Sequence, residues 1–304
     1  MHKLAHNLRG WPGRAVSKKW FETRPIYIRH AGRCLGSQFD LDCLQAEDLW
    51  KLQAYGRHKH FKPETINKLT GCLKALCRDL GIDKQAEFDR AGRLRVPASD
   101  KEVGAWTRQQ RDFILAEAES GPAKMAPEPL AFLKFVAFTG VRASEALGVR
   151  WKQVFLEAGY VRIIEGRVGQ DTTDLKTRDS ARTLHLPKLA LAVLAGIRPK
   201  APDPDGFVFL GARGRPLDLH NFRARCWLPL IDECELCGVP RFEFKAFRHT
   251  AATIMLQSGL KTRFEVAAYL GHSVEILEQR YAKWLPRPDD LDEALGLPQL
   301  KAVK

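Results

Sequence analysis

Six side chains between positions 142 and 281 have the types needed to cleave a phosphodiester. They are Arg142, Lys176, Lys245, Arg248, His272 and Tyr281. Cleavage without a metal requires a nucleophile, cations that hold the non-bridging oxygens, and an acid that protonates the departing alkoxide. Arginine suits the second task because its planar fork binds two phosphate oxygens and stays charged. Taken singly, each of these cations is also typical of a solvated surface.

The spacing of His272 and Tyr281 limits how the two can act together. They are nine positions apart, so on one straight helix they would point to opposite sides, roughly 13 Å apart along the axis. They share a pocket only if the helix begins after His272. Ser273 is a suitable N-cap and follows Gly271, so we expect His272 in the preceding loop. The alternative is an amphipathic helix in which Tyr281 only packs its ring.

The chain is basic and long enough for two domains. Its 304 residues hold 49 Lys and Arg against 36 Asp and Glu, a net charge of +13, and 45% of them are apolar. Residues 1–107 alone carry 20 basic and 12 acidic side chains, or +8. Because the excess is spread without a block of like charges, we expect a folded surface that faces a polyanion, most commonly nucleic acid. A basic protein without such a partner is the alternative.

The apolar runs and the cysteines of the chain indicate where the protein is located and whether it binds a metal. No apolar run approaches the roughly 18 residues of a membrane helix, and none near the N-terminus has signal-peptide length, so we expect a cytoplasmic protein with no membrane contact. The chain has 7 cysteines, an odd number that favours reduced thiols over disulfides. Cys234 and Cys237 form a lone C-x-x-C, which supplies at most half a zinc site. We interpret them as structural thiols.

The first third of the chain predicts a small, basic, helical domain over residues 17–90. Helices are expected in SKKWFETRPIYIRHAGRC, AEDLWKLQAYGRHKH and PETINKLTGCLKALCRDLG, the last with proline near its start and Gly81 beyond its end. Its apolar stripe has helical spacing and consists of Ile66, Leu69, Leu73, Leu76 and Leu80. Residues 1–16 precede this domain as an extension. Residues 91–107 contain glycine, proline and charge, and are predicted to be a linker.

A second domain, 108–286, is predicted to be mainly α with a small antiparallel sheet, an α+β fold. Helices are expected in RQQRDFILAEAES, PEPLAFLKFVAF and a short segment that ends near Gly148, and again in FKAFRHTAATIMLQSGL, RFEVAAYLGHS and VEILEQRYAKWL. YVRII, DTTDLKT and ARTLHLP have the character of strands, with TRDSA as a turn between the last two. The tail 287–304 contains DDLDEALGL, a candidate short helix after a proline-rich break.

Four segments, taken in order, resemble the tyrosine recombinases, or phage-type integrases. TGVRASEAL is similar to that family's first arginine box and LKTRDSARTLHLP to its lysine hairpin. KAFRHTAAT is similar to its H/K-x-x-R-H box, and LGHSVEILEQRY to its closing histidine and tyrosine segment. Four boxes in the right order over about 140 residues make a highly specific match.

The resemblance implies a role for each candidate residue. Arg142 and Arg248 would clamp the scissile phosphate, and His272 would hydrogen-bond to it. Lys176 would protonate the leaving 5′ oxygen, and Tyr281 would be the nucleophile. A tyrosine of ordinary pKa is only about 0.1% phenolate at pH 7, so neighbouring cations would help to generate the nucleophile. The implied 3′-phosphotyrosyl intermediate conserves the energy of the broken strand, so neither ATP, metal nor any other cofactor is expected.

Two further residues have less certain roles under this resemblance. Lys245 stands where many relatives have a histidine of general-base character. A protonated lysine cannot accept a proton, so either burial and Arg248 lower its pKa or it serves as a further phosphate donor, the role that we favour. Glu145, three residues after Arg142 and on the same helical face, fits the family's supporting carboxylate, which holds an arginine in place. A plain surface ion pair is the alternative.

The resemblance also implies partners and an assembly. The domain 17–90 would be a core-binding domain that closes with the catalytic domain around double-stranded DNA at specific recombination sites. Phosphate contacts would supply most of the affinity and make it strongly salt-dependent. Four protomers would act on two duplexes as a homotetramer, and the tail 287–304 is a candidate for docking on a neighbour. Accessory DNA-bending or directionality factors are further expected partners, in the nucleoid of the cytoplasm.

Three alternatives remain open from the sequence. A Xer-like, transposon or integron-type recombinase would keep the chemistry and change the biology. A type IB topoisomerase shares the catalytic logic but relaxes one duplex as a monomer. A DNA-binding accessory protein that has lost catalysis belongs to a different class, and the presence of every catalytic position argues against it.

Overall fold

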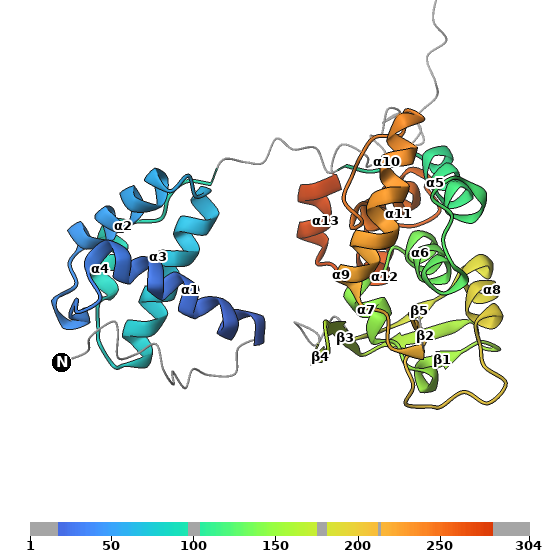
Figure 1. Cartoon of the computed structure of the whole chain (residues 1–304), viewed down its shortest axis with the longest axis horizontal. Coiled ribbons are helices and arrows are strands. Elements are labelled where there is room, and N and C mark those ends of the chain that lie inside the picture. Colours follow the sequence, from blue (N-terminus) through green and yellow to red (C-terminus); the bar gives the residue numbers. More distant parts are fainter. Residues whose placement is uncertain (1–17, 97–103, 175–180, 212–213, 282–304) are drawn as a thin grey trace, which may run out of the picture. The chain divides into compact units, whose positions relative to one another are not determined.

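The computed structural model describes residues 18–96, 104–174, 181–211 and 214–281. The chain forms two compact units, Met1–Asp100 and Lys101–Lys304, and each is described by itself (Figure 1). Among the described residues, no helix is both long enough and apolar enough to cross a membrane.

The first unit contains α1 (Lys18–Leu35), α2 (Ala46–His58), α3 (Pro63–Asp79) and α4 (Gln85–Ala91). The three helices expected from sequence are present, and α1 packs against both α2 and α3. Proline begins α3 because its missing N–H is unbonded at that position anyway. The chain leaves this helix at Gly81, whose φ of +74° favours glycine. The core is formed by buried apolar side chains of α1, α2, α3 and the loop after α1, including Ile28, Leu41, Leu44, Leu49, Leu52, Leu69, Leu73 and Leu76.

The segment expected to be a linker, 91–107, is bound to the folded units at both of its described ends. The short helix α4 was not predicted and reaches Ala91. Beyond it, the side chain of Asn67 exchanges two 2.9 Å hydrogen bonds with the backbone of Leu94. At the other end Trp106 is buried in the core of the second unit, and its backbone N–H donates to Thr250 Oγ1 at 2.9 Å. The described part of the chain therefore leaves a shorter connection than the sequence suggested.

The second unit is mainly helical. Its helices are α5 (Arg108–Ser120), α6 (Pro127–Thr139), α7 (Ala143–Gly148), α8 (Lys188–Gly196), α9 (Leu219–Phe222), α10 (Leu228–Leu236), α11 (Ala246–Gln257), α12 (Arg263–Leu270) and α13 (Val274–Tyr281). The apolar helix α6 contacts α5, α7, α8 and α11. Around it lies a cluster of packed aromatic rings, formed by Trp106, Phe132, Phe135, Phe209, Phe222, Trp227, Phe244 and Phe247. Helices α8, α9 and α10 were not identified from the sequence.

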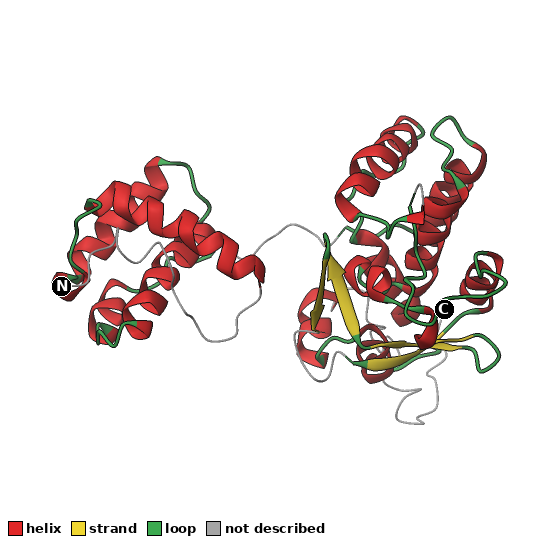
Figure 2. Ribbon diagram, turned by 60° about the horizontal axis from the view of Figure 1, so that its bottom comes forward, coloured by secondary structure: helices red, strands yellow, loops and turns green. Residues whose placement is uncertain are grey.

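The strands form two small antiparallel sheets rather than one (Figure 2). One sheet contains β1 (Val154–Phe155), β2 (Tyr160–Ile163) and β5 (Arg182–His185), in the order β1-β2-β5. The other pairs β3 (Glu165–Val168) with β4 (Asp171–Asp174). Strand β4 pairs with β3 and β5 pairs with β2, and the predicted turn TRDSA lies outside the described residues except for Ala181. The mainly α fold with small antiparallel sheets is confirmed.

Strand β3 was missed because its sequence, EGRV, lacks the β-branched pattern of a strand. A two-residue turn follows it, and Gly169 in that turn has a φ of +63°. This conformation suits a tight hairpin connection and is readily adopted by glycine. The hairpin therefore depends on the turn more than on strand propensity.

Gly140 joins α6 to the segment that contains Arg142, and it has no room for a side chain. Its φ is +66°, and an added Cβ would stand 2.5 Å from the Cβ of Ala251 on α11. We expect Gly140→Ala to lower the free energy of unfolding by roughly 2–5 kcal/mol, since left-handed strain costs about 1–2 and overpacking about 1–3. Urea denaturation followed by circular dichroism measures this loss.

Gly159→Ala is the matched control for that variant. Its φ is +73°, but the nearest atom to an added Cβ is 3.8 Å away. We expect only the backbone strain there, roughly 1–2 kcal/mol. Equal losses in the two variants would show that the close approach of α6 and α11 is unimportant.

Candidate active site

Arg248 is held at the meeting point of three segments of the second unit. Its side chain extends from the first turn of α11, and the residue is only 7% exposed. Nη1 donates to the carbonyl of Gly140 at 3.2 Å, Nη2 donates to the carbonyl of Leu270, and Nε lies 3.0 Å from Nε2 of His272. Gly140 and Leu270 stand at the C-terminal ends of α6 and α12, where helix carbonyls carry negative partial charge. Two helix ends therefore stabilise this buried cation.

Arg142 is the N-cap of α7 and lies on the more open side of the site. Its Nη2 donates to the carbonyl of Gly271 at 3.0 Å, and its Nη1 donates to Glu145. The backbone N–H of Arg142 also donates to Glu145 Oε2 at 3.3 Å, so this carboxylate caps the helix as well as holding the guanidinium. The side chain of Arg142 remains 39% exposed, which leaves it accessible to a ligand.

Arg182, at the start of β5, completes the ion-pair network and was not identified from the sequence. Its Nη2 lies 3.0 Å from Glu145 Oε2, its Nε donates to the carbonyl of Tyr269 at 2.8 Å, and the side chain is 8% exposed. An added Cβ on Gly271 would stand 2.8 Å from Arg182 Nη1. A single arginine in a strand gives no signal in one sequence, because its contacts come from segments far along the chain.

Glu145 bridges Arg142 and Arg182, so it is more than a surface ion pair. Burial alone would raise the pKa of Glu145, but the charges and hydrogen bonds of Arg182 and Arg142 outweigh that effect and lower it. The carboxylate therefore stays ionised. It is the carboxylate that both of these arginines contact.

The site has an excess of positive charge. Burial, and after it the charge of Arg142, lowers the pKa of Arg248 to about 9. The described ion pairs give Arg248 no carboxylate partner, and its acceptors are backbone carbonyls and a histidine ring. Because nearby cations disfavour the charged form of Arg248, a bound anion would stabilise that form. Together with the exposed face of Arg142, this arrangement fits a phosphate or another oxyanion.

His272 lies in the loop before α13, as its spacing from Tyr281 required. Gly271 ends α12 with a φ of +66°, and the N–H of His272 donates to the carbonyl of Ala267 at 2.9 Å. Ser273 Oγ accepts from the N–H of Ile276, at the long distance of 3.4 Å. The helix then begins at Val274. The loop thus directs the histidine toward Arg248 while α13 carries the tyrosine.

Tyr281 is fully enclosed in this conformation. The residue is 0% exposed and belongs to an apolar cluster of α11, α12 and α13 with Leu256, Val266 and Leu277. Its hydroxyl lies 2.5 Å from Nδ1 of His249, the residue directly after Arg248. The enclosure of this hydroxyl does not follow from the sequence. Another molecule can reach this hydroxyl only after the side chains that cover it move aside.

His249 is a second residue that the sequence reasoning did not single out. It stands within KAFRHTAAT, directly after Arg248, and is 8% exposed. Its place next to Arg248 could have identified it from the sequence. Adjacent residues on a helix differ in direction by about 100°, so His249 can contact a second group close to the one that Arg248 contacts. Arg248 and His249 can therefore serve two neighbouring groups.

Two expected lysines are not part of the described cluster. The side chain of Lys245 is 70% exposed and pairs with Glu243 at 3.0 Å, one turn before Arg248. The burial that a general-base role would require is therefore absent. Lys176 lies outside the described residues, as do the extension 1–16 and the tail 287–304.

The cysteine pair shows no metal site. Cys234 belongs to the core of the second unit, where burial raises the pKa of its thiol to about 12, whereas Cys237 is exposed. Across the parts of the chain that the structure describes, no three His, Cys, Asp or Glu side chains are grouped to hold a metal ion.

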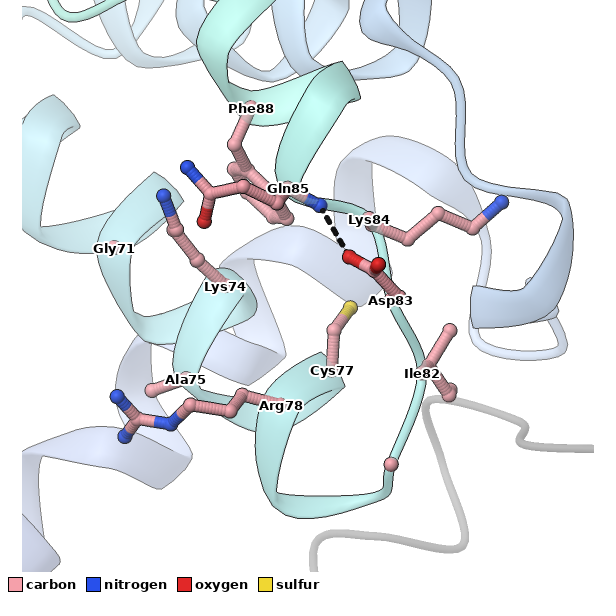
Figure 3. Close-up of a pocket in the computed structure, with 11 residues that line it drawn as sticks. Gly71, Lys74, Ala75, Cys77, Arg78, Ile82, Asp83, Lys84, Gln85 and Phe88 are labelled. Atoms are coloured by element: carbon pink, nitrogen blue, oxygen red, sulfur yellow. Dashed lines mark hydrogen bonds between the residues drawn. The ribbon is translucent and has the colours of Figure 1, made fainter.

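The first unit has a basic cleft of its own, about 430 Å³ in volume. Lys74 and Arg78 line it from α3, and Lys84 lines it from the segment before α4 (Figure 3). Asp83 is the acidic residue of the lining, and it accepts from the N–H of Gln85 at 3.1 Å. The cleft therefore presents more positive than negative charge.

The charge of the arginine cluster predicts that a simple oxyanion stabilises the protein. At ten times its dissociation constant, such a ligand adds about 1.4 kcal/mol to the free energy of unfolding, or roughly 3–6 °C in Tm for a unit of this size. We expect inorganic sulfate, at constant ionic strength, to raise the Tm of the wild type and to have less effect on Arg142→Gln. Arg241→Gln, which removes an exposed arginine paired with Asp232 and Glu235, is the control. An equal response in all three proteins would exclude the site.

The chain is similar to known proteins in both sequence and fold. Residues 106–286 match the model of the phage integrase family. Tyrosine recombinase XerC of Stutzerimonas stutzeri (strain A1501) is 26% identical over 230 residues, which span 76% of this chain and 73% of the relative.

Two solved structures share the fold. The Tn1549 transposon integrase in complex with transposon right end DNA has a TM-score of 0.74 at 15% identity and covers 97% of this chain and 98% of its own. A lambda integrase tetramer bound to a Holliday junction has a TM-score of 0.60 at 15% identity and covers 87% of this chain and 72% of its own. Since the family model spans residues 106–286 of 304, the protein belongs to the phage integrase family of tyrosine recombinases, enzymes that break and rejoin DNA at specific sites.

Proposed function

We propose that this recombinase cuts duplex DNA through a covalent bond between Tyr281 and the 3′ phosphate of the broken strand. The observation that carries the proposal is the meeting of two groups on the first turn of α11. Arg248 ends in a site where three arginines surround the one described carboxylate, Glu145. His249 contacts the tyrosine hydroxyl at 2.5 Å. We infer that a phosphate bound by Arg248 comes within reach of this hydroxyl once it is accessible.

The proposed reaction has two transesterification steps. Arg142, Arg248 and His272 hold the non-bridging oxygens of the scissile phosphate, whose negative charge increases as the nucleophile approaches. The Oη of Tyr281 forms a bond to phosphorus, and the bond to the 5′ oxygen breaks. That oxygen takes a proton, for which Lys176 is the proposed donor. In the second step a 5′ hydroxyl attacks phosphorus and releases the tyrosine.

No external energy source is needed in this scheme. Each step exchanges one phosphate ester for another, so the bond energy of the strand is retained in the phosphotyrosyl link. The proposed roles of the arginines, the lysine and the histidine supply charge and protons without a metal ion. We therefore propose a reaction that is independent of ATP and of metals.

Double-stranded DNA and other copies of the chain are the proposed partners. The cleft of the first unit offers Lys74, Arg78 and Lys84 to phosphates, and the net charge of +13 favours a polyanion. The solved transposon integrase is bound to DNA, and the lambda integrase structure is a tetramer on a Holliday junction. By analogy, we propose that residues 17–90 form a core-binding domain and that four protomers act on two duplexes.

Xer-like recombination is the second candidate function, favoured by the similarity to XerC over 230 residues. Resolution of DNA dimers and integration of a mobile element use the same chemistry and differ in the DNA sites that are joined. Sequencing the products made from DNA that flanks the gene distinguishes them. Junctions between an element and its target indicate integration, whereas reduction of a dimer to monomers indicates a Xer-like role.

Removing the tyrosine hydroxyl tests the proposed nucleophile. We expect Tyr281→Phe to abolish a denaturant-resistant adduct with nicked duplexes that tile the DNA flanking the gene, because the variant lacks the attacking oxygen. The fold should survive, since one buried hydrogen bond contributes only about 1 kcal/mol. Tyr160→Phe, on β2 and stacked against Phe155, is the control and should form the adduct. An adduct that persists in Tyr281→Phe would mean that another residue is the nucleophile.

Neutralising Glu145 tests whether its bridge positions the arginines. Glutamine cannot balance Arg142 and Arg182, so the two guanidiniums should move apart and cleavage should fall by roughly 10²-fold, as displacements near 1 Å can cause. Binding of the same duplex, measured by gel shift, should change less. Glu165→Gln removes a comparable partner of Arg150 at 2.8 Å and should leave cleavage intact. Equal cleavage rates in the two variants would contradict the positioning role.

A further inference from the structure

The proposed reaction leaves one proton without an assigned acceptor. A tyrosine attacks phosphorus as its phenolate, yet at pH 7 only about 0.1% of an ordinary tyrosine is ionised. A base must therefore take the phenolic proton, within about 2.6–3.2 Å of the oxygen that carries it. Lys245, which stands where a general base would be expected, is 70% exposed and paired with Glu243.

His249 meets the geometric requirement for a base. Its Nδ1 lies 2.5 Å from the hydroxyl oxygen of Tyr281, and both side chains are buried. The imidazole extends from α11, which is packed in the core, whereas the tyrosine extends from α13. A histidine whose Nε2 carries the proton presents Nδ1 as an acceptor. The contact then has the direction that proton transfer from the phenol requires.

The neighbourhood of Arg248 connects this pair to the phosphate site. His249 follows Arg248 on the same helix turn, and the hydroxyl of Tyr281 lies 2.5 Å from the ring of His249. His249 and Arg248 thus both extend from one end of α11, and the hydroxyl of Tyr281 on α13 lies against His249 there.

We propose that His249 is a catalytic residue that accepts the phenolic proton of Tyr281 as the tyrosine attacks the phosphate. The Oη–H bond breaks and the proton moves to Nδ1, while the oxygen's electron pair forms the bond to phosphorus. In the reverse step the imidazolium returns the proton to the tyrosine that leaves. This inference rests on the proposed function, and it adds the base that the proposed function lacks.

Replacement by asparagine separates accepting a hydrogen bond from accepting a proton. In His249→Asn the amide oxygen stands near the former Nδ1 position and can accept the hydrogen bond, but it is not basic. We expect adduct formation on the nicked flanking duplexes to fall by roughly 10²–10⁴-fold, the usual contribution of a general base. His185→Asn, the same change at an exposed histidine beside Tyr160, is the matched control. If the asparagine variant has a much lower Tm, rescue by a more acidic phenol at position 281 separates loss of the base from damage to the fold.

A fluorinated tyrosine placed at position 281 provides the decisive readout. Its phenol loses its proton more readily, so it depends less on a base. In the His249→Asn background it should restore adduct formation at least tenfold, whereas a purely structural defect would not respond. Failure of this rescue would overturn the proposal, and so would an adduct rate in His249→Asn equal to or above that of the wild type. An adduct from Tyr281→Phe would instead refute the proposed function.

Discussion

The site depends on the burial of the Arg248 guanidinium against the ends of two helices. A buried cation is costly unless its donors are bonded, and the carbonyls of Gly140 and Leu270 supply acceptors at the C-termini of α6 and α12. Helix ends suit this task because their carbonyls are negative without being titratable. Arg248 is thereby fixed, while its charge remains available to a ligand. A carboxylate in the same place would have fixed the side chain but cancelled that charge.

The other two arginines, Arg142 and Arg182, are held by a carboxylate instead of by helix carbonyls alone. Arg142 and Arg182 share Glu145, which orients two guanidiniums with one negative charge. The three arginines and one carboxylate leave a cationic site whose guanidiniums are held by hydrogen bonds to protein groups. Order of this kind reduces the reorganisation needed when charge develops on a phosphate. Tyr281, in contrast, lies in an apolar cluster with its hydroxyl on His249. In the proposed reaction, uncovering this hydroxyl is therefore a separate event from binding the phosphate.

Much of the fold followed from local sequence signals. Helical spacing gave α2 and α3, and the need to separate His272 from Tyr281 gave the loop before α13, since these depend on neighbours along the chain. Strand β3 and the partners of β4 and β5 could not be derived, because pairing is set by contacts between distant segments. For the same reason the role of Arg182 could not be predicted, because it contacts Glu145 across 37 positions of the chain. The enclosure of Tyr281 likewise depends on distant segments. Resemblance supplied the roles of the candidate residues, whereas the structure supplied their hydrogen bonds.

The central claim is that the phenol oxygen of Tyr281 becomes bonded to DNA. The most direct measurement is to trap the protein on nicked duplexes from DNA flanking its gene, digest the complex with nuclease and protease, and locate the nucleotide by mass spectrometry. The account predicts a peptide in which Tyr281 carries a nucleotide through its 3′ phosphate. A nucleotide linked to any other side chain, or joined through a 5′ phosphate, would contradict it.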